Sequence, residues 1–264
     1  MAWLFAGYAF LYLPIALLVV FSFNDSRLLT AWSGFSLRWY VALWNDPSLI
    51  GAALLSLRIA VIAATIATVV GTAAGYALAR FGRFRFRGAF AAALSVPLVL
   101  PDVIVGLSLL LFFVVLAGLT GWPAERGATT VALAHASFAL AYVAVVVQGR
   151  LAEAGAELEE AAMDLGASPW GAFLRISLPL MAPALLSGWL LAFTLSLDDV
   201  VVASFVSGPG ASTLPMVLFS TLRVGLTPEM NALASVVLAI VLLALFGAWL
   251  ARRRNPVAAR PALR

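Results

Sequence analysis

The sequence has 264 residues, and among them there is no lysine and no cysteine. Without lysine, a Walker A phosphate loop and Schiff-base chemistry are excluded, so the chain is not itself an ATPase of that type. Without cysteine, disulfides, thiolate metal sites and cysteine nucleophiles are excluded. The single histidine, His135, lies in an apolar run. We expect it to be a packed or hydrogen-bonded residue of a helix.

Charge of either sign is also scarce. Charged residues make up 11% of the chain and hydrophobic residues 64%, whereas a soluble domain carries about 25% charged residues. Apolar runs long enough to cross a bilayer recur along the chain. They predict an all-α, multi-pass integral membrane protein with six transmembrane helices, the first of them retained and not removed as a signal peptide. The expected spans cover about residues 3–23, 54–78, 90–116, 130–147, 180–205 and 232–250.

The arginines gather at the ends of these apolar runs, mostly on one side of the membrane. Because cytoplasmic loops carry the excess of positive charge, the asymmetry places both termini and the loop around Glu160 in the cytoplasm. This topology explains the basic pI without nucleic acid as a partner. The arginines on the cytoplasmic side are Arg80, Arg83, Arg85, Arg87, Arg150, Arg175, Arg252, Arg253 and Arg254, and those on the opposite side are Arg27, Arg38, Arg126 and Arg223, with Arg58 near the start of the second run.

The order of runs and loops divides the chain into three parts. Residues 1–50 hold the first span and an outer loop, residues 51–250 hold five spans and a polar loop at about 150–178, and residues 251–264 form an arginine-rich cytoplasmic tail. The third run contains Pro97 and Pro101. Proline removes a backbone hydrogen bond and kinks a helix. The two prolines are interpreted either as a hinge or as packing geometry.

The polar loop has the pattern of two short helices joined by a tight turn. Leu158, Ala161, Ala162 and Leu165 recur at helical spacing on one face, and a second, acidic stripe runs alongside through Glu153, Glu157, Glu160 and Asp164. Gly166 stands where a left-handed C-terminal cap would end the first helix. Ser168 and Pro169 are typical of the start of a second helix. The small-residue face suits docking into a protein groove, and the acidic stripe disfavours the alternative of a helix lying on an anionic membrane surface.

This loop resembles the EAA loop of type I permeases of ATP-binding-cassette (ABC) importers. The resemblance rests on Glu160, Ala161, Ala162, Gly166, Ile176, Leu178 and Pro179 at the family's spacing, with Asp164 between them. It implies that these residues form a coupling helix, which enters a cleft on a separate ATPase subunit. It further implies a bacterial inner-membrane protein that is not an enzyme and binds no cofactor, because ATP and Mg²⁺ are used by the partner ATPase.

A narrower resemblance points to the second permease subunit of putrescine/spermidine importers. The resemblance rests on the segments "PLVLPDVIVGLSLLL", "SLDDVVVASFVSGPGASTLPM" and "GLTPEMNALAS". The middle segment is closer to the putrescine version than to the spermidine version. The resemblance implies a heterodimer with a second permease subunit, a dimer of ABC ATPases in the cytoplasm and a periplasmic polyamine-binding protein.

Three carboxylates lie within or at the edges of the apolar runs: Asp102, Asp198 and Asp199. A charge at the bilayer centre costs roughly 2.5–3.5 kcal/mol on insertion scales, so such residues usually face a cavity or a partner. One hypothesis is that they line the path of a polycation, with Trp189 and Phe193 supplying aromatic faces. The other is that Asp198 and Asp199 are structural and pair with Arg223 or with the partner subunit.

Two other functions compete with polyamine transport. A type I ABC permease for another solute, of the sulfate, iron or thiamine class, has the same architecture, and the aspartates favour a cation. An intramembrane protease is the remote alternative. Adjacent residues of a helix point about 100° apart, so Asp198 and Asp199 cannot form a catalytic dyad with each other. No aspartate has a Gly-x-Gly-Asp context and no serine has a Gly-x-Ser-x-Gly context.

Overall fold

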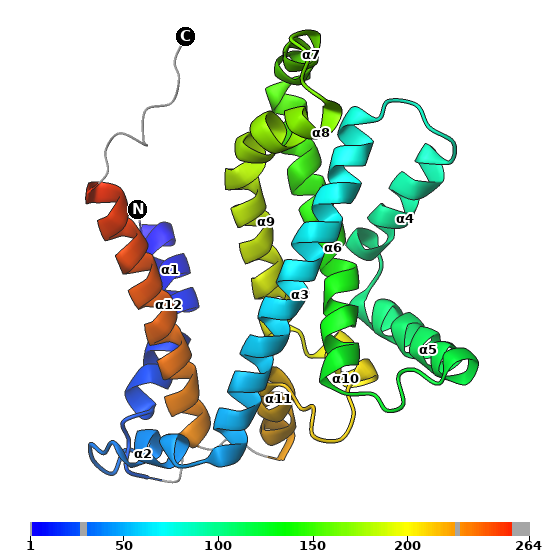
Figure 1. Cartoon of the computed structure of the whole chain (residues 1–264). Helices are drawn as coiled ribbons and strands as arrows, with labels where there is room; N and C mark the ends of the chain where they lie inside the picture. The colour runs from blue at the N-terminus through cyan, green and yellow to red at the C-terminus, as the bar shows by residue number, and fades with distance from the viewer. Residues whose placement is uncertain (1, 27–30, 225–227, 255–264) are drawn as a thin grey trace. The chain divides into compact units, whose positions relative to one another are not determined.

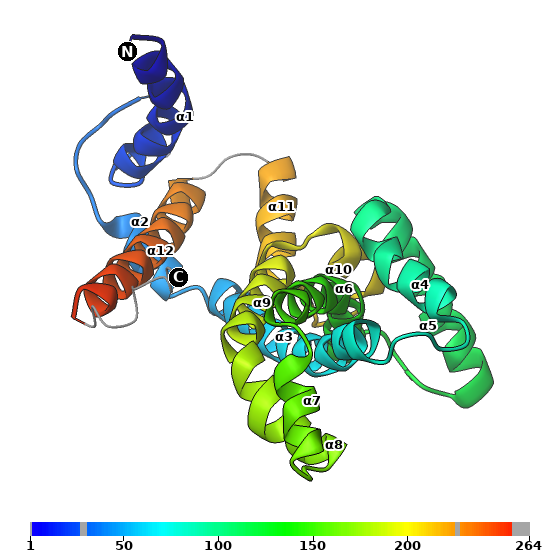
Figure 2. The same cartoon turned by 90° about the horizontal axis from the view of Figure 1, so that it is seen from above.

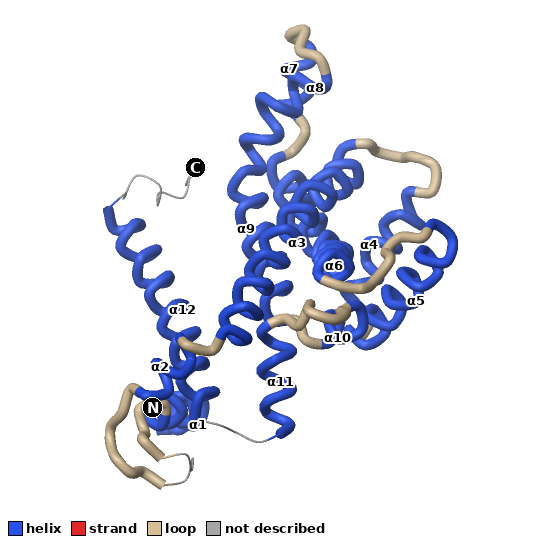
Figure 3. Tube along the Cα trace, turned by 60° about the horizontal axis from the view of Figure 1, so that its bottom comes forward, coloured by secondary structure: helices blue, strands red, loops and turns tan. Residues whose placement is uncertain are grey.

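A computed structural model describes residues 2–26, 31–224 and 228–254 of the chain. Within these residues all regular elements are helical (Figures 1 and 3), which confirms the prediction of an all-α protein. The elements are α1 (Ala2–Phe21), α2 (Arg38–Trp44), α3 (Pro47–Arg80), α4 (Arg87–Val99), α5 (Asp102–Thr120), α6 (Ala128–Ala154), α7 (Glu157–Asp164), α8 (Pro169–Ala172), the π-helix η1 (Phe173–Ser177), α9 (Leu178–Asp198), α10 (Val201–Val206), α11 (Leu214–Val224) and α12 (Pro228–Arg254).

The described helices that are long and apolar enough to cross a membrane overlap five of the six predicted spans. Five segments meet both conditions: Trp3–Phe21, Pro47–Arg80, Asp102–Thr120, Ala128–Ala154 and Pro169–Asp198. The sixth predicted span falls on α12, which is helical over 27 residues. At 1.5 Å per residue, that length exceeds the roughly 30 Å of a hydrocarbon core.

The third predicted span is not one helix, because the chain breaks between α4 and α5. Leu100 is extended, with φ −75° and ψ 141°, and Pro101 follows with ψ 140°. A proline ring clashes with a helical conformation of the residue before it, so Leu100 is forced out of the helix. Pro97, in contrast, remains inside α4. The two prolines of this run therefore act differently, and it is Pro101 that separates the helices.

The fifth predicted span is also shifted. Helix begins at Pro169 and continues to Asp198, so it starts earlier than residue 180 and ends before residue 205. Asp199 is extended, with ψ 128°, and α10 begins only at Val201. The π-helical turn η1 ends at Ser177, two residues before Pro179, whose missing N–H cannot donate to the preceding turn. A π-turn is one way for a long helix to accommodate such a residue.

Helix α6 is the centre of the unit formed by residues 51–219. Most of its buried residues are alanine or valine, and it packs against α4, α5, α9 and α10 (Figure 2). Its contact with α3 is close enough to need glycine. A Cβ atom at Gly71 would lie 2.7 Å from the carbonyl oxygen of Leu140, and one at Gly75 would lie 2.6 Å from that of Ala144. Gly71 and Gly75 form a GxxxG pair, the spacing with which membrane helices approach closely.

The other compact unit combines residues 1–50 with residues 220–264. Helix α12 packs against α1 and α2. The indole N–H of Trp39 donates to the carbonyl oxygen of Asn24 at 2.7 Å, and the hydroxyls of Ser22 and Tyr40 lie 2.7 Å apart. The division by chain order into 1–50, 51–250 and 251–264 stays a prediction, since compactness groups the last helix with the first. Residues 255–264 of the predicted tail lie outside the described residues.

Candidate coupling loop and acidic cavity

The first helix of the polar loop ends at Gly166, as its sequence predicts. Gly166 has φ +92°, the left-handed region that favours glycine. Its N–H donates to the carbonyl oxygen of Met163 at 2.9 Å, and the N–H of Ala167 donates to that of Ala162 at 2.9 Å. These two bonds are those of a Schellman cap, which satisfies carbonyls at a helix end. The cap sets the angle between α7 and the helix that follows.

The second helix of the loop begins at Ser168, also as predicted. The Ser168 hydroxyl accepts from the backbone N–H of Gly171 at 3.1 Å, and Pro169 occupies the first turn. From there α8, η1 and α9 continue as one helical segment to Asp198. The loop is therefore joined to a spanning helix without an intervening linker (Figure 1).

The residues assigned to coupling lie on the exposed part of this loop. Glu160, Ala161, Asp164 and Gly166 are exposed and Ala162 is half-buried. The apolar face around them is exposed as well: the exposed fraction is 57% for Leu158, 90% for Leu165 and 67% for Trp170. Ile176 and Leu178 are half-buried in the following helix and Pro179 is exposed. An unpaired apolar face beside acidic residues can dock on another protein.

Glu159, the neighbour of the motif residue Glu160, has a role that the sequence does not reveal. Its side chain is buried in an ion pair with Arg80, in which Nε and Oε1 are 2.9 Å apart. From the sequence, Arg80 is interpreted only as a determinant of topology. A glutamate within an acidic run carries no sequence signal of burial, so only the fold separates Glu159 from its neighbours.

A cavity of about 380 Å³ lies where the two broken spans meet α6. Asp102 lies at its edge as the first residue of α5, and Asp198 as the last residue of α9. Asp102 and Asp198 are both exposed, whereas Asp199 is half-buried. The aromatic residues of the lining come from α6. The lining comprises Pro97, Asp102, Val105, Phe138, Tyr142, Leu195, Asp198, Asp199, Val200 and Val201.

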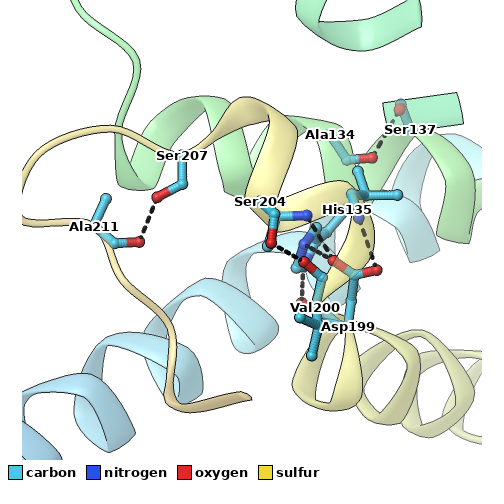
Figure 4. Close-up of polar contacts among 11 residues, drawn as sticks. Ala134, His135, Ser137, Asp199, Val200, Ser204, Ser207 and Ala211 are labelled. Atoms are coloured by element: carbon cyan, nitrogen blue, oxygen red, sulfur yellow. Dashed lines mark hydrogen bonds and ion pairs between the residues drawn. The ribbon is translucent and has the colours of Figure 1, made fainter. Parts of the chain in front are cut away.

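Asp199 is held differently from Asp198, although the two are adjacent. Its carboxylate accepts from the backbone N–H of Val202 at 3.3 Å and of Ala203 at 2.7 Å, and so caps α10. Oδ2 also lies 3.2 Å from Nε2 of His135 (Figure 4). The structural hypothesis from the sequence names Arg223 or the partner subunit as partners. Within this chain, the partners found for Asp199 are a histidine of α6 and the start of α10, and pairing with the partner subunit stays a prediction.

His135 is fully buried, which confirms its interpretation as a packed, hydrogen-bonded helix residue. Nδ1 lies 2.7 Å from the hydroxyl oxygen of Ser196 on α9. Nε2 lies close to the Asp199 carboxylate but makes no well-aligned hydrogen bond, so the hydrogen bond of the imidazole is the one with Ser196. His135 thus ties α6 to both sides of the break between α9 and α10.

Serine, histidine and aspartate in contact have the residue types of a hydrolase triad, a contact that the sequence does not reveal. Ser196 is 4% exposed and His135 0%. The Asp199 carboxylate is also committed to the cap of α10. A nucleophile must reach its substrate, and this serine is sealed inside the protein. The three residues therefore have a structural role, which is to connect α6 with the end of α9 and the start of α10.

The two aromatic residues suggested for the path do not line this cavity. Trp189 and Phe193 stack on each other, with ring centroids 5.2 Å apart, and Trp189 Nε1 donates to the Thr65 hydroxyl of α3 at 3.2 Å. Both pack against a buried cluster that includes residues of α3 and α6. The aromatic residues that line the cavity beside the aspartates are Phe138 and Tyr142. The sequence suggests Trp189 and Phe193 for this position.

The chain is similar to known permease proteins of transport systems. The chain is 56% identical over 246 residues to the putrescine transport system permease protein PotI of Escherichia coli K12, an alignment that covers 93% of this chain and 88% of the relative. It is 45% identical to the spermidine/putrescine transport system permease protein PotC of Haemophilus influenzae, with 96% of each chain covered. A bacterial ABC transporter involved in the import of the acidic polysaccharide alginate has the same fold, with a TM-score of 0.70, 15% identity and coverage of 95% of this chain and 93% of that one.

The family model for the binding-protein-dependent transport system inner membrane component matches residues 69–256. The matched segment includes the polar loop with its EAA motif and the acidic cavity. The relatives are membrane transport components and not enzymes, which agrees with the sealed position of Ser196. This chain therefore belongs to the binding-protein-dependent transport system inner membrane components, the permease subunits of ABC importers.

Proposed function

We propose that this chain is the permease subunit of a polyamine importer and that its substrate is putrescine. The observation that carries the proposal is the acidic cavity, with Asp102 and Asp198 at the ends of two broken spans and Phe138 and Tyr142 beside them. Carboxylates and aromatic faces replace part of the hydration of an alkylammonium ion. The relatives named for putrescine and spermidine transport support the same substrate class. A sulfate ion would be repelled by the two carboxylates.

Within the acidic cavity we assign different roles to the adjacent aspartates. Asp198 and Asp102 are accessible at the cavity and face the substrate path. Asp199 holds α10 and His135 in place and does not contact substrate. The orientation expected from the arginines, with both termini in the cytoplasm, puts the coupling loop on the cytoplasmic side of the bacterial inner membrane.

The proposed complex contains a second permease subunit, a dimer of ABC ATPases and a periplasmic polyamine-binding protein. The ATPases bind ATP and Mg²⁺. The exposed face of α7 docks in a cleft of the ATPase and follows its movement, and the residues that carry this coupling are Glu160, Ala161, Ala162, Asp164, Gly166, Ile176, Leu178 and Pro179. Because α8, η1 and α9 form one helical segment, a movement of the loop reaches Asp198 at the other end of that segment.

Substrate class is tested by competition. We expect ATP-dependent uptake of labelled putrescine into proteoliposomes that contain the complete complex and its binding protein. Excess unlabelled putrescine abolishes the uptake, spermidine reduces it less, and sulfate leaves it unchanged. The control is the same vesicle without ATP. Competition by sulfate, with none by either polyamine, would disprove the proposed substrate class.

The coupling role is tested at Gly166. A left-handed conformation costs an L-residue about 1–2 kcal/mol, and more for a β-branched one. No atom lies within 4 Å of a Cβ at Gly166, so Gly166→Val changes the angle of the loop without a clash. We expect uptake to fall severalfold while the assembled complex is recovered in normal yield. Gly118→Ala, at an exposed helical position, is the control. Normal uptake by the Gly166 variant would mean that the loop angle is irrelevant to transport.

A further inference from the structure

Arg80 binds three successive segments of the chain at the point where α6 gives way to the coupling loop. It is the last residue of α3. Its Nη1 donates to the carbonyl oxygen of Leu151, in the last turn of α6, at 3.2 Å, and its Nη2 donates to that of Gly155, just after α6 ends. Its Nε donates to Oε1 of Glu159, on α7, at 2.9 Å. One guanidinium therefore spans the residues before, at and after the joint.

The joint between α6 and α7 consists of residues 155 and 156, which belong to neither helix. Gly155 has φ +69° and separates the last residue of α6 from α7. Terminal carbonyls of a helix have no partner within the helix. Arg80 supplies donors to two carbonyls at this end, and positive charge near a helix C-terminus is favourable. The carbonyl oxygens of Leu151 and Gly155 thus accept hydrogen bonds from the Arg80 guanidinium, at a point where the helix that ends at Ala154 supplies no further N–H donors.

Glu159 is held on both of its oxygens by consecutive turns of α3. Besides the bond from Arg80, Oε2 accepts from the Tyr76 hydroxyl at 3.1 Å. The two charged side chains are nearly closed to solvent, with exposed fractions of 12% for Arg80 and 9% for Glu159. Charge-assisted bonds in such a setting are short and strong. In contrast, the neighbouring Glu157 and Glu160 of the same helix are exposed.

Aromatic packing extends the same connection. The Tyr76 ring meets the Phe173 ring edge to face, with centroids 5.0 Å apart, and Phe173 stacks on Trp170 of α8 at 5.3 Å. Tyr76 is therefore connected to both halves of the loop: to α7 through Glu159, and to α8 and η1 through Phe173. Both connections start from the C-terminal end of α3.

We propose that Arg80, Glu159 and Tyr76 form a strut that fixes the coupling loop to α3 and to the end of α6. A movement of the loop then moves α3, α6 and α9 together, whereas without the strut the loop would tilt about Gly155 and move α9 alone. The three residues are positioning residues, because they act through the loop and do not contact ATP or substrate. The inference rests on the coupling role proposed above for this loop.

The first test measures rigidity and does not require transport. The chain has no cysteine, so spin labels at Ala73→Cys on α3 and Met163→Cys on α7 are specific when the chain is labelled before it is assembled with its partner subunits. In the complete complex in nanodiscs, we expect one narrow distance distribution, unchanged in width when ATP is bound. Glu159→Gln keeps the shape but removes the charge, and is expected to broaden the distribution. Glu157→Gln, an exposed glutamate of the same helix, is the matched control and leaves the distribution narrow.

The second test separates positioning from mere stability. We expect Glu159→Gln to lower putrescine uptake per ATP hydrolysed by roughly fivefold, while the yield of complex with bound ATPase is preserved. Tyr76→Phe, which removes one hydroxyl, should give a smaller loss of the same kind. Arg80→Lys should resemble Glu159→Gln, because Arg80 reaches its three acceptors from three separate nitrogens, and the single nitrogen of an ammonium group cannot reach all three positions.

The outcomes are distinguishable. A narrow distance distribution in Glu159→Gln with unchanged uptake per ATP would overturn the strut. A lower yield of complex with unchanged uptake per ATP would also overturn it, because that result describes a structural ion pair. If the native complex does not take up putrescine, the proposed function fails, while the distance measurement still decides whether the loop is rigidly held.

Discussion

Replacing Asp198 with asparagine is expected to lower putrescine uptake by roughly tenfold or more. The substitution keeps the shape of the side chain and removes the charge that attracts an ammonium group. Hydrogen bonds to charged groups contribute about 1.5–3 kcal/mol, and each 1.4 kcal/mol corresponds to about a factor of ten. Asp198 lines the cavity, and the carboxylate that caps α10 is that of Asp199, so the complex should assemble normally. Uptake and assembly are measured on the same preparation.

The adjacent residue supplies the matched control. Asp199→Asn is expected to reduce the yield and thermal stability of the complex, with uptake per assembled complex much less affected. The reason is that Asp199 accepts two backbone N–H groups of α10 and faces buried His135, and weakening such a buried network costs about 1–3 kcal/mol. If Asp198→Asn lowered assembly and Asp199→Asn lowered uptake, the roles of the two aspartates would be reversed.

The largest effect on stability is expected from the double variant Gly71→Ala, Gly75→Ala. Each added Cβ would lie less than 3 Å from a backbone carbonyl oxygen of α6, and a backbone cannot move aside as a side chain can. Overpacking costs about 1–3 kcal/mol per site, which together approaches the roughly 5–15 kcal/mol of a typical domain. We expect little folded complex, as measured by fluorescence-detected size exclusion after solubilisation.

The control for this prediction is Gly118→Ala in α5. No atom lies within 4 Å of a Cβ at that position, so the alanine should be neutral or slightly stabilising through its higher helix propensity. A double variant as stable as the Gly118 control would mean that α3 and α6 do not need their close approach.

The membrane class, the helical fold and the two-helix geometry of the polar loop follow from the sequence alone, because they are properties of local chemistry. Apolar length sets spanning helices because the bilayer offers no partners for backbone groups. The Gly166 cap and the Ser168–Pro169 start depend on backbone conformations that only a few residue types favour. The missing lysine is sufficient on its own to exclude a Walker A ATPase.

The roles of the acidic and aromatic side chains, in contrast, depend on how the helices pack. Asp198 and Asp199 are identical and adjacent in sequence and both line the cavity, but the helix ends between them, and only Asp199 also caps α10 beside His135. Glu159 lies among similar glutamates and is distinguished by Arg80, which is 79 residues earlier in the chain. Trp189 and Phe193 are close to the aspartates in sequence, whereas Phe138 and Tyr142 lie beside them in space. The role of a charged or aromatic side chain depends on its partners, and those partners come from distant segments that only the packed helices bring together.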